Sequence, residues 1–453
     1  MNIILIIIDS LRPDHLSVNG YNRNTSPNID NFYRQGTSFL NAYTSLPRTN
    51  PSLMSLFTGL YPHTHGIRLV KNDNLNFSFT HLPEILINHG YETAFMGNAG
   101  LYEPPLRKGF KKFNLLSWKI KNKIKRGLKK VLNPRNFMSS TEQYIDVAIK
   151  WIKKNSKKKF FLCLHFDDMH WPYEIPKPYD HTFDPNYKGN HDFNTLKHGK
   201  FSRGELMYGH IKFHKEEISH AIAHYDGSIK YTDLHFGRLI DFVKSKSLDD
   251  NTLIILTSDH GENFGEHNFY FLHGSSLYEP SLRVPLIFNY PKFFDGCKVI
   301  KERVRLLDIM PTILEMLNIP VLDKIDGVSL LPLINNNSKN KVKFIFAESM
   351  EEIFKENKRI FFPGVKGKWR AMIEGDWKII YIPHPEKDIF ELYNLTNDPN
   401  EQNNLIDKEK ERASYMKDKI LEFLKPQSNE GQTNLSDLTE KSRETLRKAG
   451  YIN

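Results

Sequence analysis

The apolar run from Ile3 to Ile8 ends directly at a carboxylate, Asp9. Six consecutive, mostly β-branched residues bounded by a charge are typical of a strand that is buried on both faces of a parallel sheet. The runs 160–166 and 252–257 have the same form, and polar residues follow each of them as well. Because the carboxyl ends of parallel strands meet at one edge of a sheet, we expect these polar residues to gather there, where open α/β sheets bind their ligands.

The buried runs alternate with helical segments through the first 340 residues, such as the periodic stretch from Ile229 to Val243. This alternation predicts an α/β fold with a mostly parallel sheet flanked by helices. Beyond residue 340, short alternating strands separated by Gly-Asp and Pro turns indicate a small antiparallel α+β subdomain. We therefore expect a large domain over 1–340 with a basic helical insertion at about 107–159, a small subdomain over 341–406, and a polar, helical tail over 407–453.

The net charge of +10 is concentrated in one segment. Between Arg107 and Lys159 there are 18 Lys and Arg residues against two acidic residues, so the rest of the chain is net negative. Within this segment, residues 118–131 place apolar side chains at four-residue spacing with lysines between them, which predicts a basic amphipathic helix. The helix is either a solvated surface element or a contact for an anionic membrane surface or a polyanionic glycan. The pattern matches no nucleic-acid-binding module, and we expect no nucleic-acid partner.

The N-terminal apolar run is too short for a secretory signal. No basic residues precede it, and Asp9 and Arg12 follow where small residues would mark a cleavage site. The two cysteines, Cys163 and Cys297, cannot form a disulfide framework. We therefore expect a cytoplasmic protein, either free or peripheral at the inner face of the membrane.

Three of the strand-end residues have the chemistry of metal ligands. Asp9, Asp259 and His260 each follow a buried run, so they can converge at one edge of the sheet. Two carboxylates and an imidazole suit a divalent cation, and Zn, Mn, Mg and Ca all remain open on ligand type. The alternative is that strand-end aspartates cap the helices that follow them.

Several segments resemble, in order, the motifs of the sulfatase family of the alkaline phosphatase superfamily. The resemblance extends over residues 1–405, and it implies the fold of that family and the cleavage of phosphate- or sulfate-type esters. The matching segments are Asp9-Ser10-Leu11-Arg12-Pro13-Asp14, Ser26-Pro27-Asn28-Ile29-Asp30, Thr49 to His63, Asp249 to Glu262, Leu277-Tyr278-Glu279, Arg283-Val284-Pro285, Asp308 to Thr312, Asp326 to Leu330, Gly375 to Tyr381, and Glu391 to Leu395.

The nucleophile position departs from the usual sulfatase pattern. Sulfatases carry a Cys or Ser that is oxidised to formylglycine, whereas this chain has Thr49, with Leu53 where the conversion signal has Arg. A threonine cannot yield that aldehyde, so no formylglycine is expected. Thr49 instead resembles the nucleophile of relatives that pass a phosphoryl group through a covalent threonine adduct. The resemblance implies that Asp9, Thr49, Asp259 and His260 hold the metal.

The remaining site residues also follow from the resemblance. The loop from His165 to Tyr173 is similar to a family loop whose last histidine, here His170, touches the ester, which implies a general-acid role. His165, His273 and Asn98 are implied to bind substrate, although His165 and His273 can also be read as packed or loop histidines. A second metal held by Asp168, His170 and His273 is a further alternative.

Two ligand changes bear on the metal and the substrate. Ser10 replaces the second acid of the family's Asp-Asp pair, and Asp259-His260 stands where Asp-Asn is usual. A ligand set with more nitrogen and one carboxylate fewer favours Mn or Zn, and phosphate over sulfate chemistry. The sequence thus predicts a metal-dependent hydrolase or transferase that acts through a Thr49 covalent intermediate. The alternatives are a sulfuric ester hydrolase that uses Thr49 without formylglycine, and a catalytically inactive binding protein.

Overall fold

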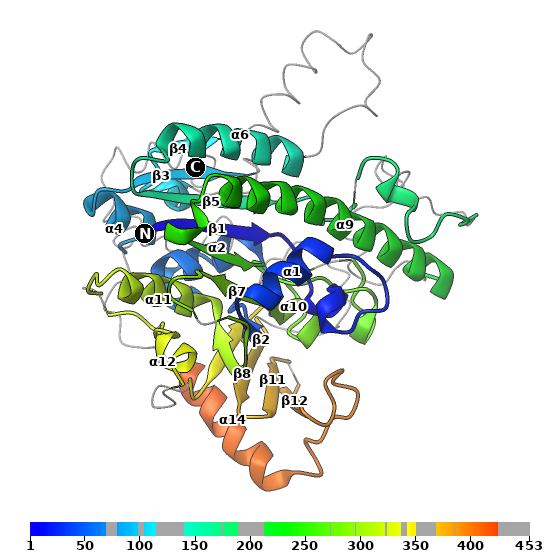
Figure 1. Cartoon of the computed structure of the whole chain (residues 1–453). Coiled ribbons are helices and arrows are strands. Elements are labelled where there is room, and N and C mark those ends of the chain that lie inside the picture. Colours follow the sequence, from blue (N-terminus) through cyan, green and yellow to red (C-terminus); the bar gives the residue numbers. More distant parts are fainter. Residues whose placement is uncertain are drawn as a thin grey trace, which may run out of the picture.

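The computed structural model describes residues 1–68, 79–97, 104–114, 140–173, 175–188, 213–271, 273–294, 296–321, 324–336, 342–349, 368–384 and 386–424. Its centre is a sheet with the strand order β4-β3-β5-β1-β6-β7-β2-β8 (Figure 1). The strands are β1 (Asn2–Ile8), β2 (Thr37–Tyr43), β3 (Glu92–Met96), β4 (Lys112–Asn114), β5 (Phe160–Phe166), β6 (Thr252–Thr257), β7 (Arg283–Asn289) and β8 (Lys298–Arg305).

The sheet is mostly parallel, and this confirms the predicted fold class. Strand β7 is the exception, because it runs antiparallel to both of its neighbours, β6 and β2. The central strands β5, β1 and β6 are all parallel to one another. Every residue of these three strands is buried, as their largely apolar sequences predict.

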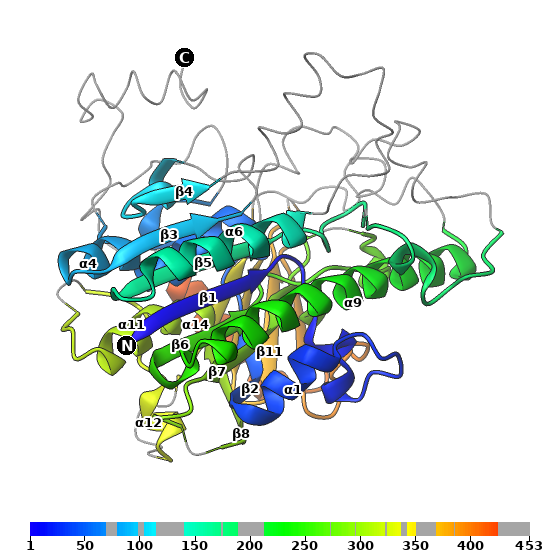
Figure 2. The ribbon, with the colours of Figure 1, turned by 45° about the horizontal axis from the view of Figure 1, so that its top comes forward.

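Helices cover both faces of the sheet, and successive residues of β1 face the two layers alternately. Ile3, Leu5 and Ile7 pack in one core with helices α2, α4 and α11, whereas Ile4 and Ile6 pack in the other with α1, α6 and α9. Figure 2 shows α6 and α9 lying side by side along the second face. The helices are α1 (Pro27–Gln35), α2 (Thr49–Thr58), α3 (Pro62–His65), α4 (Leu82–Asn88), α6 (Ser140–Asn155), α9 (Lys215–Ser245), α10 (Glu279–Leu282), α11 (Ile309–Met316), α12 (Leu331–Ile334) and α14 (Lys410–Leu424).

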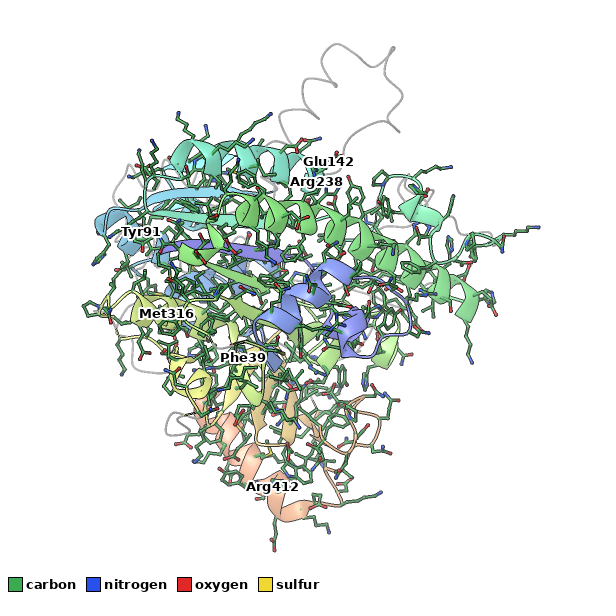
Figure 3. The ribbon with its side chains drawn as sticks, viewed as in Figure 1. Phe39, Tyr91, Glu142, Arg238, Met316 and Arg412 are labelled. Atoms are coloured by element: carbon green, nitrogen blue, oxygen red, sulfur yellow. The ribbon has the colours of Figure 1, made fainter. Side chains whose placement is uncertain are left out.

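Polar pairs join α6 to α9 at their solvent side. Arg238 on α9 donates to Asp146 on α6 at 2.7 Å, and the Tyr231 hydroxyl donates to Glu142 at 3.2 Å. Figure 3 labels Glu142 on α6 and Arg238 on α9, the two helices that these pairs join. These contacts anchor α9, which spans 31 residues and is longer than its periodic stretch predicts.

A second, antiparallel sheet forms the C-terminal subdomain, at the bottom of Figure 1. Its order is β12-β11-β10-β9, and α14 packs on one of its faces. The other face packs against Tyr43, Leu277 and Tyr278 of the large domain. The strands are β9 (Ile345–Glu348), β10 (Arg370–Glu374), β11 (Trp377–Ile382) and β12 (Ile389–Asn394).

A buried lysine connects the two domains. Lys378 on β11 is fully buried and pairs with Glu279 of α10 at 3.0 Å and with Glu401 at 2.7 Å. Tyr43 of β2 also donates to Glu279, at 3.0 Å. The subdomain is therefore held to the large sheet by charged as well as apolar contacts.

Three predicted features lie outside the described residues, namely the basic segment 118–131, Asn98 and the part of the predicted tail beyond residue 424. Their predicted roles stay predictions. Among the helices that the structure describes, none has the length and apolar character needed to cross a membrane.

Candidate active site

Three neighbouring strands bring polar side chains to the same face of the sheet, at its carboxyl-terminal edge. Asp9 follows β1 and Asp259 follows β6, each two residues beyond the paired residues Ile7 and Thr257. His165 lies on β5 opposite Ile7. Because side chains alternate along a strand, all three occupy positions in phase with Ile7, which faces the α2 layer. The sheet register alone therefore gathers two carboxylates and an imidazole.

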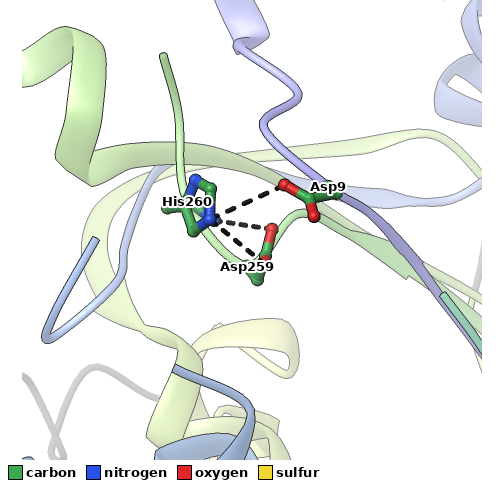
Figure 4. A group of neighbouring side chains, drawn as sticks. All are labelled: Asp9, Asp259 and His260. Atoms are coloured by element: carbon green, nitrogen blue, oxygen red, sulfur yellow. Dashed lines mark hydrogen bonds and ion pairs between the residues drawn. The ribbon is translucent and has the colours of Figure 1, made fainter. Parts of the chain in front are cut away.

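The side chains of Asp9, Asp259 and His260 form a compact, fully buried group (Figure 4). Nε2 of His260 lies 3.6 Å from Oδ1 of Asp9 and 3.4 Å from Oδ2 of Asp259. One ligand atom from each residue lies within 4.8 Å of the others. In the part of the chain that the structure describes, this is the one group of histidine, cysteine or acidic residues with such spacing.

Thr49 enters the site from the first turn of α2. Its hydroxyl oxygen lies 3.4 Å from Nε2 of His260, and the residue is 5% exposed. Ser52, one turn along, donates to the carbonyl oxygen of Asp259 at 2.7 Å and so fixes the helix to the Asp259 loop. The amino-terminal end of a helix favours an anion, because its free N–H groups and its dipole are directed at the ligand. Thr49 is thus presented where an anionic ester can bind.

The loop after β1 is held in an uncommon conformation. Ser10 has a φ of 61°, which is rare for a residue with a side chain. Its backbone N–H donates to Asp259 Oδ1 at 3.3 Å and its hydroxyl to Asp9 Oδ1 at 2.8 Å. Tyr225 of α9 donates to the Ser10 carbonyl at 2.7 Å and accepts from the Arg12 N–H at 2.8 Å. These bonds direct Asp9 toward Asp259.

The loop after β6 packs so closely on α10 that only glycine fits at position 261. Gly261 donates to the carbonyl oxygen of Ser281 at 2.9 Å, and a Cβ at this position would overlap the carbonyl oxygen of Pro280. The Nδ1 atom of His260 is 2.9 Å from the Gly261 carbonyl oxygen, so that Nδ1 donates there and Nε2 is turned toward the two carboxylates. This is the arrangement that orients a metal-binding histidine.

The pKa values of the two carboxylates shift in opposite directions. Burial, together with the neighbouring charge of Asp259, raises the pKa of Asp9 well above its usual value. Burial acts in the same direction on Asp259, but His260 and His165 outweigh it, so the pKa of Asp259 is lowered. For His165, burial is outweighed by Asp259 and Asp9, and its pKa is raised. Burial lowers the pKa of His260 and favours its neutral form, which is the form that binds metals.

These residues fit a divalent cation. Oδ2 of Asp9 and Oδ2 of Asp259 are buried, and neither accepts a hydrogen bond within the described residues. Two buried carboxylates side by side are costly unless a positive charge offsets them. Asp9, Asp259 and His260 would hold the cation, with the Thr49 hydroxyl beside it. The structure thus brings together the four residues that the sequence analysis assigned to the metal.

The other predicted residues lie around this group with different geometries. His273 stacks on His260 with centroids 3.9 Å apart, and His170 meets His273 edge to face at 5.1 Å. His165 is fully buried next to the two carboxylates. Asp168 accepts from the Thr141 N–H at 3.1 Å, in the first turn of α6. His170 and His273 are therefore neighbours. The carboxylate of Asp168 instead accepts a backbone hydrogen bond from α6, and the second metal site stays a prediction.

One buried acid escaped the sequence analysis. Glu262 is fully buried, and its Oε2 lies 3.6 Å from Nδ1 of His273. It is part of the matched segment around Asp259, yet nothing in its local pattern distinguishes it from a solvated acid. The proximity of a loop histidine 11 positions along the chain could not be read from that pattern.

Comparisons with known proteins agree with this architecture. A family model described as sulfatase matches residues 1–319, and one described as N-sulphoglucosamine sulphohydrolase, C-terminal, matches residues 265–430. An arylsulfatase of Clostridium perfringens is 27% identical, over 93% of this chain and 93% of its own length.

Two solved structures share the fold. The phosphonate monoester hydrolase of Agrobacterium radiobacter superposes with a TM-score of 0.74 at 20% identity, covering 93% of this chain and 95% of its own. A protein solved with its substrate D-glucosamine-2-N,6-O-disulfate superposes with a TM-score of 0.72 at 22% identity, covering 96% and 99%.

Proposed function

The chain belongs to the sulfatase family, and from this premise we propose that it is a metal-dependent hydrolase of phosphate-type esters that acts through a covalent intermediate on Thr49. A matching relative is named an arylsulfatase, and a protein of the same fold is named a phosphonate monoester hydrolase. The observation that carries the proposal is the Thr49 hydroxyl at the start of α2, 3.4 Å from Nε2 of His260 within the buried group of Asp9 and Asp259. A hydroxyl is a weak nucleophile unless its environment activates it.

The reaction would proceed by two displacements at phosphorus. When bound, a divalent cation would lower the pKa of the Thr49 hydroxyl and offset charge on the non-bridging oxygens. The Thr49 hydroxyl gives up its proton to solvent as Oγ1 forms a bond to phosphorus, the bond to the leaving oxygen breaks, and His170 supplies a proton to that oxygen. Water then attacks phosphorus, the bond to Thr49 breaks, and one proton of that water passes to the threonine oxygen while the other stays on the phosphate or leaves to solvent. The N–H groups at the start of α2 stabilise the anion throughout.

A sulfuric ester is the second candidate substrate. The arylsulfatase of Clostridium perfringens, which matches over most of the chain, favours it. Thr49 favours phosphate, because an unmodified hydroxyl can be displaced from phosphorus by water. An inactive binding protein would have no need of two buried carboxylates beside a hydroxyl, since the arrangement is costly.

The test is a comparison of Thr49→Ala and Thr49→Ser on p-nitrophenyl phosphate, a phenylphosphonate ester, a bis-ester and p-nitrophenyl sulfate, each with a panel of saturating divalent metals. We expect Thr49→Ala to lower kcat on the preferred phosphate-type substrate at least about 1000-fold, while Thr49→Ser keeps most of the activity. Metal content should remain largely intact in both. Wild-type turnover by Thr49→Ala would contradict the covalent mechanism, and a preference for p-nitrophenyl sulfate would favour the second candidate.

A further inference from the structure

We propose that the buried carboxylate of Glu262 positions the imidazole of His273 for its contact with the ester. Glu262 would act through His273 and would not itself touch the substrate. This inference rests on the proposed function, because it takes His273 to act on the same ester that Thr49 attacks. It gives a role to the buried acid that the sequence analysis missed.

The backbone brings Glu262 and His273 side by side. The chain turns back on itself between them, since the Phe271 N–H donates to the carbonyl oxygen of Asn263 at 2.6 Å and an antiparallel bridge lies within the turn. Glu262 and His273 lie just outside this closing bond, on the two arms of the turn. The turn therefore sets their proximity.

The arm that carries Glu262 is anchored to other parts of the site. The Arg12 guanidinium, from the loop after β1, donates to the Glu262 carbonyl oxygen at 3.0 Å. The side-chain amide of Asn263 donates to Oγ of Ser281 at 2.8 Å. The Glu262 carboxylate itself accepts from the Asn263 N–H through Oε1, at 3.2 Å. Glu262 thus has the rigid support that a residue needs in order to orient another one.

The carboxylate meets the ring of His273 at Nδ1. Oε2 of Glu262 lies 3.6 Å from that nitrogen, and the His273 residue is 3% exposed. This separation is longer than the roughly 2.7–3.2 Å of an N–H···O hydrogen bond, and catalytic pairs of this kind often tighten only when substrate binds. A carboxylate in this position keeps a proton on Nδ1 and holds the ring in one orientation.

The stack on His260 does not by itself fix the orientation of His273. A half-turn of the ring about its Cβ–Cγ bond keeps the ring plane, and with it the stack, but exchanges Nδ1 with a carbon atom. Glu262 distinguishes the two orientations, because only one of them presents a nitrogen to the carboxylate. The two nitrogens lie on different edges of the ring, so fixing Nδ1 also fixes where Nε2 points. A contact with an ester oxygen depends on that direction.

The experiment is a double-mutant cycle of Glu262→Gln and His273→Ala, measured in the metal-loaded full-length protein on its preferred ester. We expect Glu262→Gln alone to lower kcat by about 10- to 100-fold, with KM changed by less than about threefold and metal content unchanged. In the His273→Ala background the same change should lower kcat by less than about twofold, because the ring through which Glu262 acts is gone. If Glu262→Gln does not fold, Glu262→Asp completes the same cycle with a smaller loss, of at least about threefold.

The matched control is Asp233→Asn, which also replaces a buried carboxylate by an amide. Asp233 lies on α9, on the other face of the sheet, and accepts from the N–H groups of Asn28 and Ile29. The control should change kcat by less than about twofold, and by the same factor with or without His273.

Each other outcome contradicts the inference in a recognisable way. Equal effects of Glu262→Gln with and without His273 would show that Glu262 only supports the fold, and loss of metal in proportion to activity would show that it acts through His260. An unchanged kcat in either single variant also overturns the inference. A wild type that turns over none of the esters overturns both this inference and the proposed function. An inactive Thr49→Ala together with an additive cycle would overturn this inference alone.

Discussion

The imidazole rings of His260 and His273 stack with their centroids 3.9 Å apart and their planes inclined by 25°. One ring belongs to the buried group that fits a cation, and the other belongs to a separate loop that also approaches His170. The stack therefore joins the group that fits a cation to His170, the residue proposed as the general acid. It also brings His273, 13 positions along the chain from His260, next to the group that Thr49 borders.

Replacing His273 should impair catalysis more than metal binding. We expect His273→Ala to reduce kcat/KM on the preferred substrate by about 100-fold, because the ring would stabilise the charged ester or its leaving oxygen. Metal content should stay within a factor of two of wild type. A suitable control is His89→Ala, because His89 is exposed at the end of α4. Equal loss of bound metal and activity in His273→Ala would show that the ring acts only through His260.

The carboxylate of Asp233 should make stability depend on pH. This α9 residue accepts from the N–H groups of Asn28 and Ile29 and thereby caps α1. Burial raises its pKa from the ordinary 3.8 of an aspartate to about 6. A raised pKa means that the folded state holds the proton more tightly than the unfolded state. The resulting stabilisation is full below about pH 4 and is lost as the pH rises through about 6.

The measurement is urea unfolding of wild type and Asp233→Asn at several pH values between 5 and 8. Between pH 8 and pH 5 the wild type should gain stability relative to the variant, by an amount that cannot exceed about 3 kcal/mol for a shift of this size. If the difference in unfolding free energy between the two proteins is constant across this pH range, Asp233 is not the source of the pH dependence.

The buried ion pairs of Lys378 should be strongly coupled. Lys378→Met would leave Glu279 and Glu401 buried without their counter-ion, which typically costs about 3–5 kcal/mol. Adding Glu401→Gln to that variant should recover part of the loss, because one of the unpaired charges is removed. Chemical denaturation of the single and double variants measures both effects. The exposed pair of Lys419 and Glu422 provides a control, since Lys419→Met should barely move the unfolding midpoint.

The basic segment should bind anionic surfaces in a salt-dependent manner. Exposed charges are screened over about 10 Å at 0.1 M salt, so binding to anionic liposomes or a polyanionic glycan should fall steeply as salt increases. Lys→Glu changes at Lys121, Lys125 and Lys129 should reduce that binding and leave turnover of a small neutral-tailed ester unchanged. If the triple variant binds anionic surfaces as the wild type does, the prediction is wrong and the segment is only a solvated surface element.

The buried strands and the polar residues at their ends could be predicted from the local sequence. The run from Ile3 to Ile8 indicates a buried strand because six apolar residues need cover on both faces. The placement of Asp9 and of the Asp259-His260 pair at strand ends predicts a common edge, and the structure brings them within one ligand shell. These features depend on short-range periodicity, which survives in the sequence whatever the partners are.

Other features were decided only by the tertiary structure. Strand β7 carries a buried apolar run like that of β6, yet it runs in the opposite direction, because such a run contains no information about direction. Helix α9 begins at Lys215, 14 residues before the predicted periodic stretch. Its polar first half is stabilised by packing on the rest of the protein, which outweighs the local signal.

The position of His165 shows the difference most clearly. From the sequence, it is one histidine near the end of an apolar strand, with a packed core role and a substrate-binding role both open. The pairing of β5 with β1 determines which face it occupies, and the register with Ile7 determines its depth beneath Asp9. Strand pairing joins residues more than 150 positions apart, and the free energy that selects one register comes from burying the whole sheet. The sequence therefore determined which groups the site contains, and the sheet decided which of them share it.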